Sequence, residues 1–154
     1  MLFPGGRLPL RIFEARYMEM AKTCLKDGAP FGVCLIEEGK EVGAPAIPAN
    51  VGTLARIGAW DMPQLGVLQV VAKGERRFRI RERRVRPDGL ALASVELLAE
   101  EADAAPAGSL AWCATLVTRV PLPLDLQQEL LELDDAPARL ALLSAKLKGF
   151  RAAP

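Results

Sequence analysis

The chain has 154 residues, of which 51% are hydrophobic and 25% are charged, and its formal net charge is +1. This composition is typical of a globular protein, and the length is sufficient to bury a core. A net charge so close to zero gives no overall field that would attract nucleic acid or an anionic membrane. No apolar run approaches the roughly 18 residues that a membrane span requires.

The residue types that are absent or scarce exclude several classes of chemistry. There is no histidine, so catalytic sites that need an imidazole are excluded. The cysteines, Cys24, Cys34 and Cys113, are far apart and lack the C-x-x-C spacing of zinc sites. Three such cysteines predict reduced thiols and a cytoplasmic location. We therefore expect a protein that is not an enzyme and that uses no catalytic residue, metal ion or cofactor.

The first segment predicts a turn, a short strand and an early helix. Residues 2–9 are rich in proline and glycine, and an apolar stretch follows them. Phe13, Tyr17 and Cys24 then recur at the spacing of one helix face, which predicts a helix over 13–26. Asp27 and Gly28 are a typical helix end.

The middle of the chain predicts a series of short strands separated by glycine and proline turns. Alternating or continuous apolar runs are the evidence for strands, and Gly74-Glu75 is interpreted as a break between two of them. The expected strands cover residues 31–36, 51–57, 65–73, 77–85 and 90–98. Such a pattern with one early helix is typical of a small curved barrel.

The last third of the chain predicts helices. An alanine- and proline-rich linker covers 102–108, and apolar residues at helical spacing follow it. Asp134, Asp135 and Pro137 form the start signal of a final helix. The expected fold is α+β and mainly β, with a β-barrel subdomain over 1–103 and a helical subdomain over 107–154.

Several motifs resemble, in the same order, those of the substrate-binding amino-terminal domain of Lon proteases (protease La). They are Leu2-Phe3-Pro4-Gly5, Ile12-Phe13-Glu14-Ala15-Arg16-Tyr17, Phe31-Gly32-Val33, Glu41-Val42-Gly43, Val51-Gly52-Thr53-Leu54-Ala55 and Gly74-Glu75-Arg76-Arg77-Phe78-Arg79-Ile80. The resemblance implies a pseudo-barrel like that of PUA domains, followed by a helical bundle. It also implies binding of unfolded or exposed protein segments, by a stand-alone member without ATPase or protease domains.

Two departures from the family pattern shape what we expect of the chain. The family usually has one more strand before the Leu2-Phe3-Pro4-Gly5 motif, and its helical tail is usually longer. We therefore expect a late start site or a trimmed sequence. A missing strand would leave a sheet edge unpaired, which favours self-association into a homo-oligomer.

Candidate binding residues come from the exposed aromatic and charged positions near these motifs. A groove between barrel and helical tail would bind an extended, partly apolar segment, with aromatic anchors and orienting charges at its rim. The candidates are Phe3, Arg11, Glu14, Tyr17, Trp60 and Arg77. The alternative interpretation is structural: Phe13 and Tyr17 lie in the core, Glu14 and Arg16 pair locally, and Trp112 packs between tail and barrel.

The arginine-rich stretch over 76–86 supports a second hypothesis. In a strand, Arg77, Arg79, Arg81 and Arg83 would form one basic row that could bind RNA phosphates. The low net charge and scarce aromatics favour a solvated face instead, and so argue against a nucleic-acid partner. Three functions stay open: a protein-binding module, an RNA-binding module, and an adaptor for a separate ATP-dependent protease.

Overall fold

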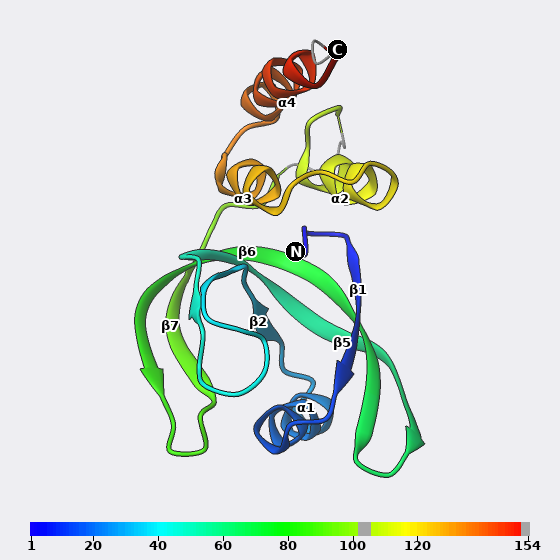
Figure 1. The fold of residues 1–154 in the computed structure, drawn as a ribbon, viewed down its shortest axis with the longest axis vertical. Helices are drawn as coiled ribbons and strands as arrows, with labels where there is room; N and C mark the ends of the chain where they lie inside the picture. The colour runs from blue at the N-terminus through cyan, green and yellow to red at the C-terminus, as the bar shows by residue number, and fades with distance from the viewer. Residues whose placement is uncertain (102–105, 152–154) are drawn as a thin grey trace.

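The computed structural model describes residues 1–101 and 106–151, and it has a strand-rich part and a helical part (Figure 1). The helices are α1 (Ala15–Asp27), α2 (Leu110–Arg119), α3 (Leu124–Glu132) and α4 (Ala136–Arg151). The strands are β1 (Arg7–Ile12), β2 (Phe31–Val33), β3 (Ile36–Glu38), β4 (Ile47–Pro48), β5 (Val51–Gln64), β6 (Val67–Val85) and β7 (Ala91–Leu97). The helices α2, α3 and α4 gather at one end, and α1 lies at the other. None of the helices in these ranges is long and apolar enough to cross a membrane.

The long strand β6 organises the main sheet. Its first half pairs with β1 and β5, and its second half pairs with β5 and β7, all antiparallel. The order is β1-β6-β5-β2, with β7 also on β6, while β3 and β4 form a separate pair. One strand of 19 residues serves three neighbours because it curves, as Figure 1 shows. The mainly β architecture with an early helix and later helices is confirmed.

The expected break at Gly74-Glu75 is wrong, because β6 runs without interruption from Val67 to Val85. Gly74 has a different purpose: a Cβ at this position would collide with the backbone of Phe3. The N-terminal segment crosses β6 there, and Gly74 exchanges backbone hydrogen bonds of 2.9 Å with Gly5 and Gly6. The glycine therefore permits a close approach of two backbones and does not end a strand.

Helix α1 ends where the sequence predicts, but its first residues differ from the expectation. Gly28 has a φ of 62°, and its N–H caps the helix on the carbonyl oxygen of Cys24. Phe13, expected in the core, precedes the helix and is 55% exposed. Tyr17 does pack against the small core cluster that contains Ile12 and Ala21. The helix starts two residues later than predicted, and this leaves the Phe13 ring in solvent.

A core cluster joins the barrel to the helices. Phe3, from the opening turn, is 1% exposed and packs with Val51 of β5 and with Leu130 of α3. Trp112 packs against the same cluster, in agreement with its predicted place between tail and barrel. Phe3 is therefore a structural anchor, and the expectation that it binds a partner is wrong.

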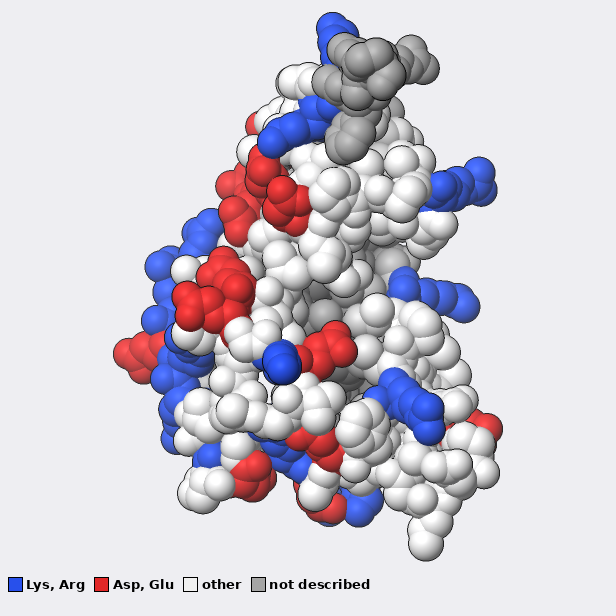
Figure 2. Space-filling view, in the orientation of Figure 1, with Lys and Arg blue, Asp and Glu red and all other residues white. Residues whose placement is uncertain are grey.

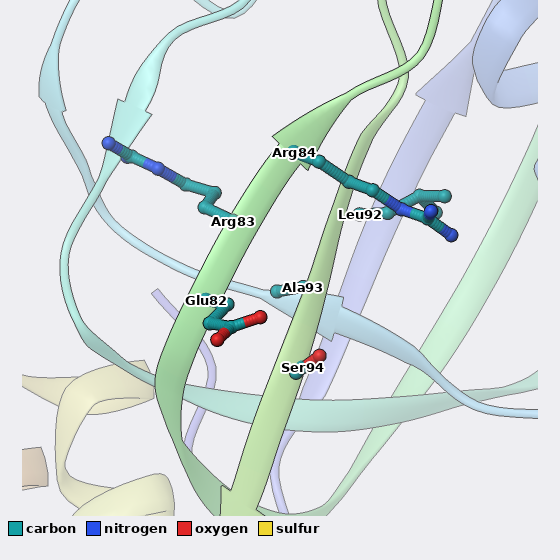
Figure 3. Close-up of a pocket in the computed structure, with 6 residues that line it drawn as sticks. All are labelled: Glu82, Arg83, Arg84, Leu92, Ala93 and Ser94. Atoms are coloured by element: carbon teal, nitrogen blue, oxygen red, sulfur yellow. The ribbon is translucent and has the colours of Figure 1, made fainter.

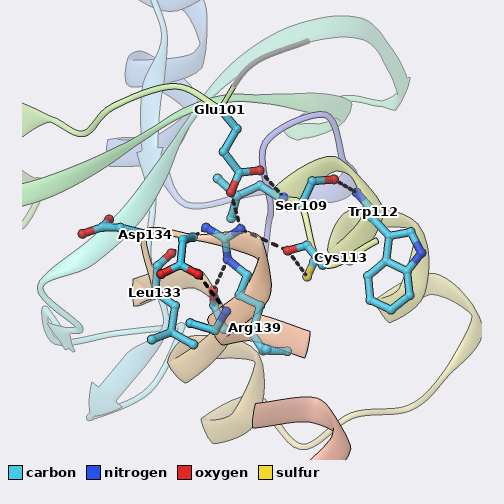
Figure 4. Close-up of polar contacts among 12 residues, drawn as sticks. Glu101, Ser109, Trp112, Cys113, Leu133, Asp134 and Arg139 are labelled. Carbon is cyan, nitrogen blue, oxygen red and sulfur yellow. Dashed lines mark hydrogen bonds and ion pairs between the residues drawn. The ribbon is translucent and has the colours of Figure 1, made fainter. Parts of the chain in front are cut away.

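Two buried arginines converge on the last turn of α3. Arg77, from β6, donates to the carbonyl oxygens of Leu131 (2.8 Å) and Leu133 (3.0 Å). Arg139, from α4, donates to Leu130 (3.0 Å) and Leu133 (2.5 Å), and it pairs with Glu101 (Figure 4). The last carbonyls of a helix lack partners within the helix. The two guanidinium groups supply the missing donors. Their positive charge also interacts favourably with the negative end of the helix dipole.

The position of Arg77 contradicts its expected place in an exposed row. Its side chain is 1% exposed and also pairs with Asp134 at 3.1 Å. Burial lowers the pKa of Arg77, and the hydrogen bond with Asp134 opposes this effect. Arginine stays charged in proteins, so the charge has to be compensated locally. Arg77 lies between barrel and helices as a buried structural contact, which does not support its predicted role at the rim of a binding groove.

We predict that Arg139→Met will strongly destabilise the protein. The substitution removes the cation that pairs with Glu101 and the buried donor to the carbonyl oxygen of Leu130, and breaking a buried ion pair costs about 3–5 kcal/mol. The free energy of unfolding can be measured by urea denaturation. Arg119→Met is the matched control, because Arg119 is an exposed arginine at the end of α2; its expected effect is within about 0.5 kcal/mol. Equal losses for both variants would contradict this role of Arg139.

The cysteines lie inside the fold as unpaired thiols. Cys24 and Cys113 are buried, and Cys34 is partly buried. Desolvation raises the pKa of Cys34 and of Cys113 from 9.0 to about 11. It also raises the pKa of Cys24, with Asp27 adding to the effect. All three are therefore protonated at neutral pH, which makes them poor nucleophiles.

We predict that stability falls as the pH rises from about 9 to about 11. The thiols ionise near 9 in the unfolded chain but near 11 in the folded one, so unfolding releases protons in this window. In this window each thiol lowers the free energy of unfolding by about 1.4 kcal/mol per pH unit. Replacing both Cys34 and Cys113 with alanine should flatten the slope. Leu143→Ala, a cavity control, should lower stability and leave the slope unchanged; a flattened slope there would contradict the assignment.

Candidate protein-binding surface

The two most exposed large apolar side chains among the described residues lie on the hairpin formed by β5 and β6. Leu65, at its turn, is 97% exposed, and Trp60 and Met62 on β5 are 59% and 42% exposed. Gly66 has a φ of 82°, the left-handed conformation that this turn needs. Scattered apolar residues on a surface are ordinary, but several on one projecting hairpin are typical of an interaction site.

A shallow groove runs across the sheet beside this hairpin. It has a volume of about 330 Å³ and is lined by residues of β1, β5 and β6. Three strands meet there in register, because Val71 on β6 is paired with Pro9 on one side and Ala59 on the other. This rung is apolar across its width, and Trp60, which belongs to the adjacent rung and is paired with Val70, also borders the groove. We call the groove and the hairpin residues Trp60, Met62 and Leu65 the hairpin surface.

Polar groups line the groove two rungs along the sheet, on the same face as Val71. Gln69 of β6 lies between Arg11 of β1 and Asp61 of β5. Figure 2 shows that the projecting hairpin, at the lower right, is mostly uncharged, with basic side chains above it. An apolar centre with a few charges at its rim is the usual composition of a protein interface. The surface can therefore bury apolar side chains and orient them by charge.

The structure brings together only some of the residues singled out from the sequence. Arg11 and Trp60 line the same groove. Glu14 and Tyr17 instead surround Arg16: Glu14 pairs with it at 2.9 Å, and the Tyr17 ring lies 4.7 Å from its guanidinium carbon. These contacts hold α1 in place, in agreement with the structural alternative for Glu14 and Arg16. Glu14 and Tyr17 therefore lie outside the hairpin surface, as do Phe3 and Arg77. The hairpin surface contains fewer of the candidate residues than expected.

The basic row expected on β6 does not form. The pairing with β7 shifts register between Ile80 and Glu82, so side chains on either side of the shift change faces. Arg79 is paired with Glu96, whereas Arg83 is paired with Ala93, and these two partners lie on opposite faces of β7. Arg81 forms an ion pair with Glu96. Figure 3 shows Arg83 and Arg84 leaving β6 in opposite directions.

The described residues offer little for chemistry at the hairpin surface. Within them, no group of three or more acidic, cysteine or histidine side chains is placed to hold a metal ion. The thiols are protonated at neutral pH and lie away from the groove residues. What the surface can do is bind another polypeptide through apolar contacts.

Sequence reasoning missed most of the hairpin surface. For Met62 the sequence predicts only a turn over 61–64, and Leu65 and Val71 fall within the expected strand over 65–73. The available signal was Leu65 itself, an apolar residue between Gln64 and Gly66 at a hairpin turn. Such a residue has no core to face.

Comparisons with known proteins identify the family and the fold. The family described as the ATP-dependent protease La (LON) substrate-binding domain matches residues 1–111. A structure of a Lon N-terminal domain protein from Xanthomonas campestris is 34% identical with a TM-score of 0.80, and the match covers 94% of this chain and 92% of that one. The N-terminal domain of Mycobacterium avium complex Lon protease shares the fold at 15% identity, with a TM-score of 0.64 and coverage of 93% and 90%.

Curated relatives are much longer proteins. Cereblon from Gallus gallus is 31% identical over 103 residues, which are 65% of this chain and 22% of that protein. Cereblon from Danio rerio is 27% identical over 124 residues, which are 79% and 28% of the two chains. The chain thus spans less than a third of these relatives. With the family pattern covering most of its length, the chain belongs to the family of Lon (protease La) substrate-binding domains.

Proposed function

We propose that this chain is a non-enzymatic module that binds extended, partly apolar segments of other proteins on the hairpin surface. The observation that carries the proposal is the exposure of Trp60 and Leu65 beside an apolar groove on a rigid sheet. Family membership supports it, because the matching domain is described as substrate-binding. Burial of these side chains by a partner would supply the free energy of binding.

The structure favours this function over RNA binding. Phosphate recognition needs several free cations on one face. Here Arg77 is buried, Arg81 is paired with Glu96, and Arg79 and Arg83 lie on opposite faces. In Figure 2 the basic side chains along the left edge have acidic side chains among and beside them. RNA binding therefore stays the alternative prediction.

Delivery of the bound segment to a separate ATP-dependent protease stays a prediction that rests on the family. The three unpaired thiols support a reducing compartment, and a cytoplasmic location is part of the proposal. The division into subdomains at 1–103 and 107–154 also stays a prediction.

We expect an unfolded polypeptide to bind saturably and with little dependence on salt. The probe is a fluorescein-labelled, reduced and carboxymethylated polypeptide, measured by fluorescence anisotropy at 50 and 200 mM salt. An RNA oligomer with the same label is titrated in parallel. Binding of the RNA alone, with a steep loss of affinity at high salt, would overturn the proposal.

We predict that Trp60→Ala and Leu65→Ala will each weaken polypeptide binding about tenfold or more. Aromatic anchors with solvent-free contacts dominate protein interfaces, and a tenfold change corresponds to about 1.4 kcal/mol. Leu147→Ala on α4 is the control, because Leu147 is also an exposed leucine, at 41%. Its affinity should match that of the unchanged protein. Equal weakening in all three variants, at unchanged melting temperature, would place binding elsewhere.

A further inference from the structure

The second half of the sheet ends in an edge that lacks the usual protection. Within the described residues, β7 pairs with β6 alone. Strand edges are normally blunted by proline, lysine or shortness. Strand β1 carries Pro9 between two arginines, and β2 has only three residues. Strand β7 has the sequence ALASVEL over seven residues, with neither proline nor lysine.

The direction of the free backbone groups follows from the printed hydrogen bonds. The N–H of Leu98 donates to the carbonyl of Arg77, and the N–H of Arg86 donates to the carbonyl of Leu90. The backbone N–H and C=O groups of the even-numbered residues of β7 therefore point toward β6, because their direction alternates from one residue to the next along a strand. The outward N–H and C=O groups belong to Ala91, Ala93, Val95 and Leu97. All four residues are exposed, and in the described part of the chain none of these outward groups has a hydrogen-bond partner.

One face of this edge is apolar, and a cation reaches over the other. The side chains of Ala91, Ala93, Val95 and Leu97 share a face, and Val95 and Leu97 are 38% and 46% exposed. On the opposite face, Arg84 of β6 is the neighbour of Leu92. Figure 3 shows the Arg84 side chain extending across β7 past Leu92, along the pocket that both residues line. Among the described residues, Arg84 has no ion-pair partner.

We propose that the edge of β7 binds an extended segment of another protein as an added strand, with alternating apolar residues and an acidic residue placed against Arg84. Main-chain hydrogen bonds to Ala91, Ala93, Val95 and Leu97 supply affinity, and the side-chain pattern supplies specificity. The inference rests on the proposed function, for which it specifies a second contact and a class of substrate.

The surroundings favour one strand over a folded partner. Arg16 donates both to the carbonyl of Gly89, in the turn before β7, and to that of Gly43 in the loop after β3. One guanidinium thus holds that loop beside the start of the edge. An added strand needs only the inter-strand spacing of about 4.8 Å. A second folded copy would have to bring its own sheet past this loop.

The test uses a fluorescein-labelled nine-residue peptide of alternating valine and glutamate, and a partner peptide of alternating valine and lysine. We expect the glutamate peptide to bind and the lysine peptide to bind at least tenfold more weakly. Val95→Pro removes an outward N–H that β6 does not use, so it should weaken binding about tenfold. Val95→Thr keeps this N–H and is the matched control, with affinity close to that of the unchanged protein.

Charge reversal tests the role of Arg84. Arg84→Glu should weaken binding of the glutamate peptide and improve binding of the lysine peptide, whereas Arg83→Glu, on the other face, should change neither by more than about twofold. Equal effects of Val95→Pro and Val95→Thr, or no exchange of preference in Arg84→Glu, would overturn the inference. So would a concentration-dependent dimer without peptide in analytical ultracentrifugation, since a second copy would then occupy the edge.

The experiments distinguish failure of the added strand at β7 from failure of the proposed function. Leu65→Ala should leave affinity for the nine-residue peptide unchanged, because Leu65 lies at the turn of the other hairpin. If the β7 variants have no effect while Leu65→Ala still weakens polypeptide binding, only the added strand is refuted. Circular dichroism and the melting temperature verify that each variant is folded.

Discussion

The arrangement of barrel and helices depends on which groups donate hydrogen bonds to the backbone carbonyls at the end of α3. This helix has no glycine in a left-handed cap; Leu133, its C-cap, has a φ of −68°. Its final carbonyls would be buried without donors, which costs free energy for each unpaired group. Arg77 from the barrel and Arg139 from α4 provide these donors. The same contacts join three parts of the chain that are distant in sequence, so a local need of one helix end fixes the tertiary arrangement.

This constraint separates residues that hold the molecule together from residues free to bind. Phe3, Arg77 and Arg139 lie at the junction of barrel and helices and are almost completely buried. Arg16 has a similar role at the opposite end, where it ties α1 to two loops. The hairpin of β5 and β6 has no such partner and projects from the sheet. Exposed apolar residues accumulate there because no other element in the described part of the chain covers them.

The two proposed contacts share a physical basis in the length of β6. A strand of 19 residues extends beyond the region where one of its faces is buried in the core, and residues 81–85 at its end are all exposed. Its start forms the hairpin surface with β5, and its end forms the exposed pair with β7. A rigid sheet fixes apolar side chains and backbone groups before a partner arrives, which lowers the entropic cost of binding. An extended segment is the ligand best suited to both, because it presents side chains and backbone at once.

The sequence by itself determined the class of fold and the position of most elements. Apolar spacing, the Asp27-Gly28 stop and the Asp134-Asp135 start depend on local chemistry, and a linear pattern records local chemistry well. Trp60 and Arg11 were also identified from the sequence. Only the tertiary structure decided that Gly74 permits a close approach of two backbones and that Arg77 and Phe3 are buried. Each of these depends on what a distant segment places beside the residue, and residue order alone does not specify that neighbour.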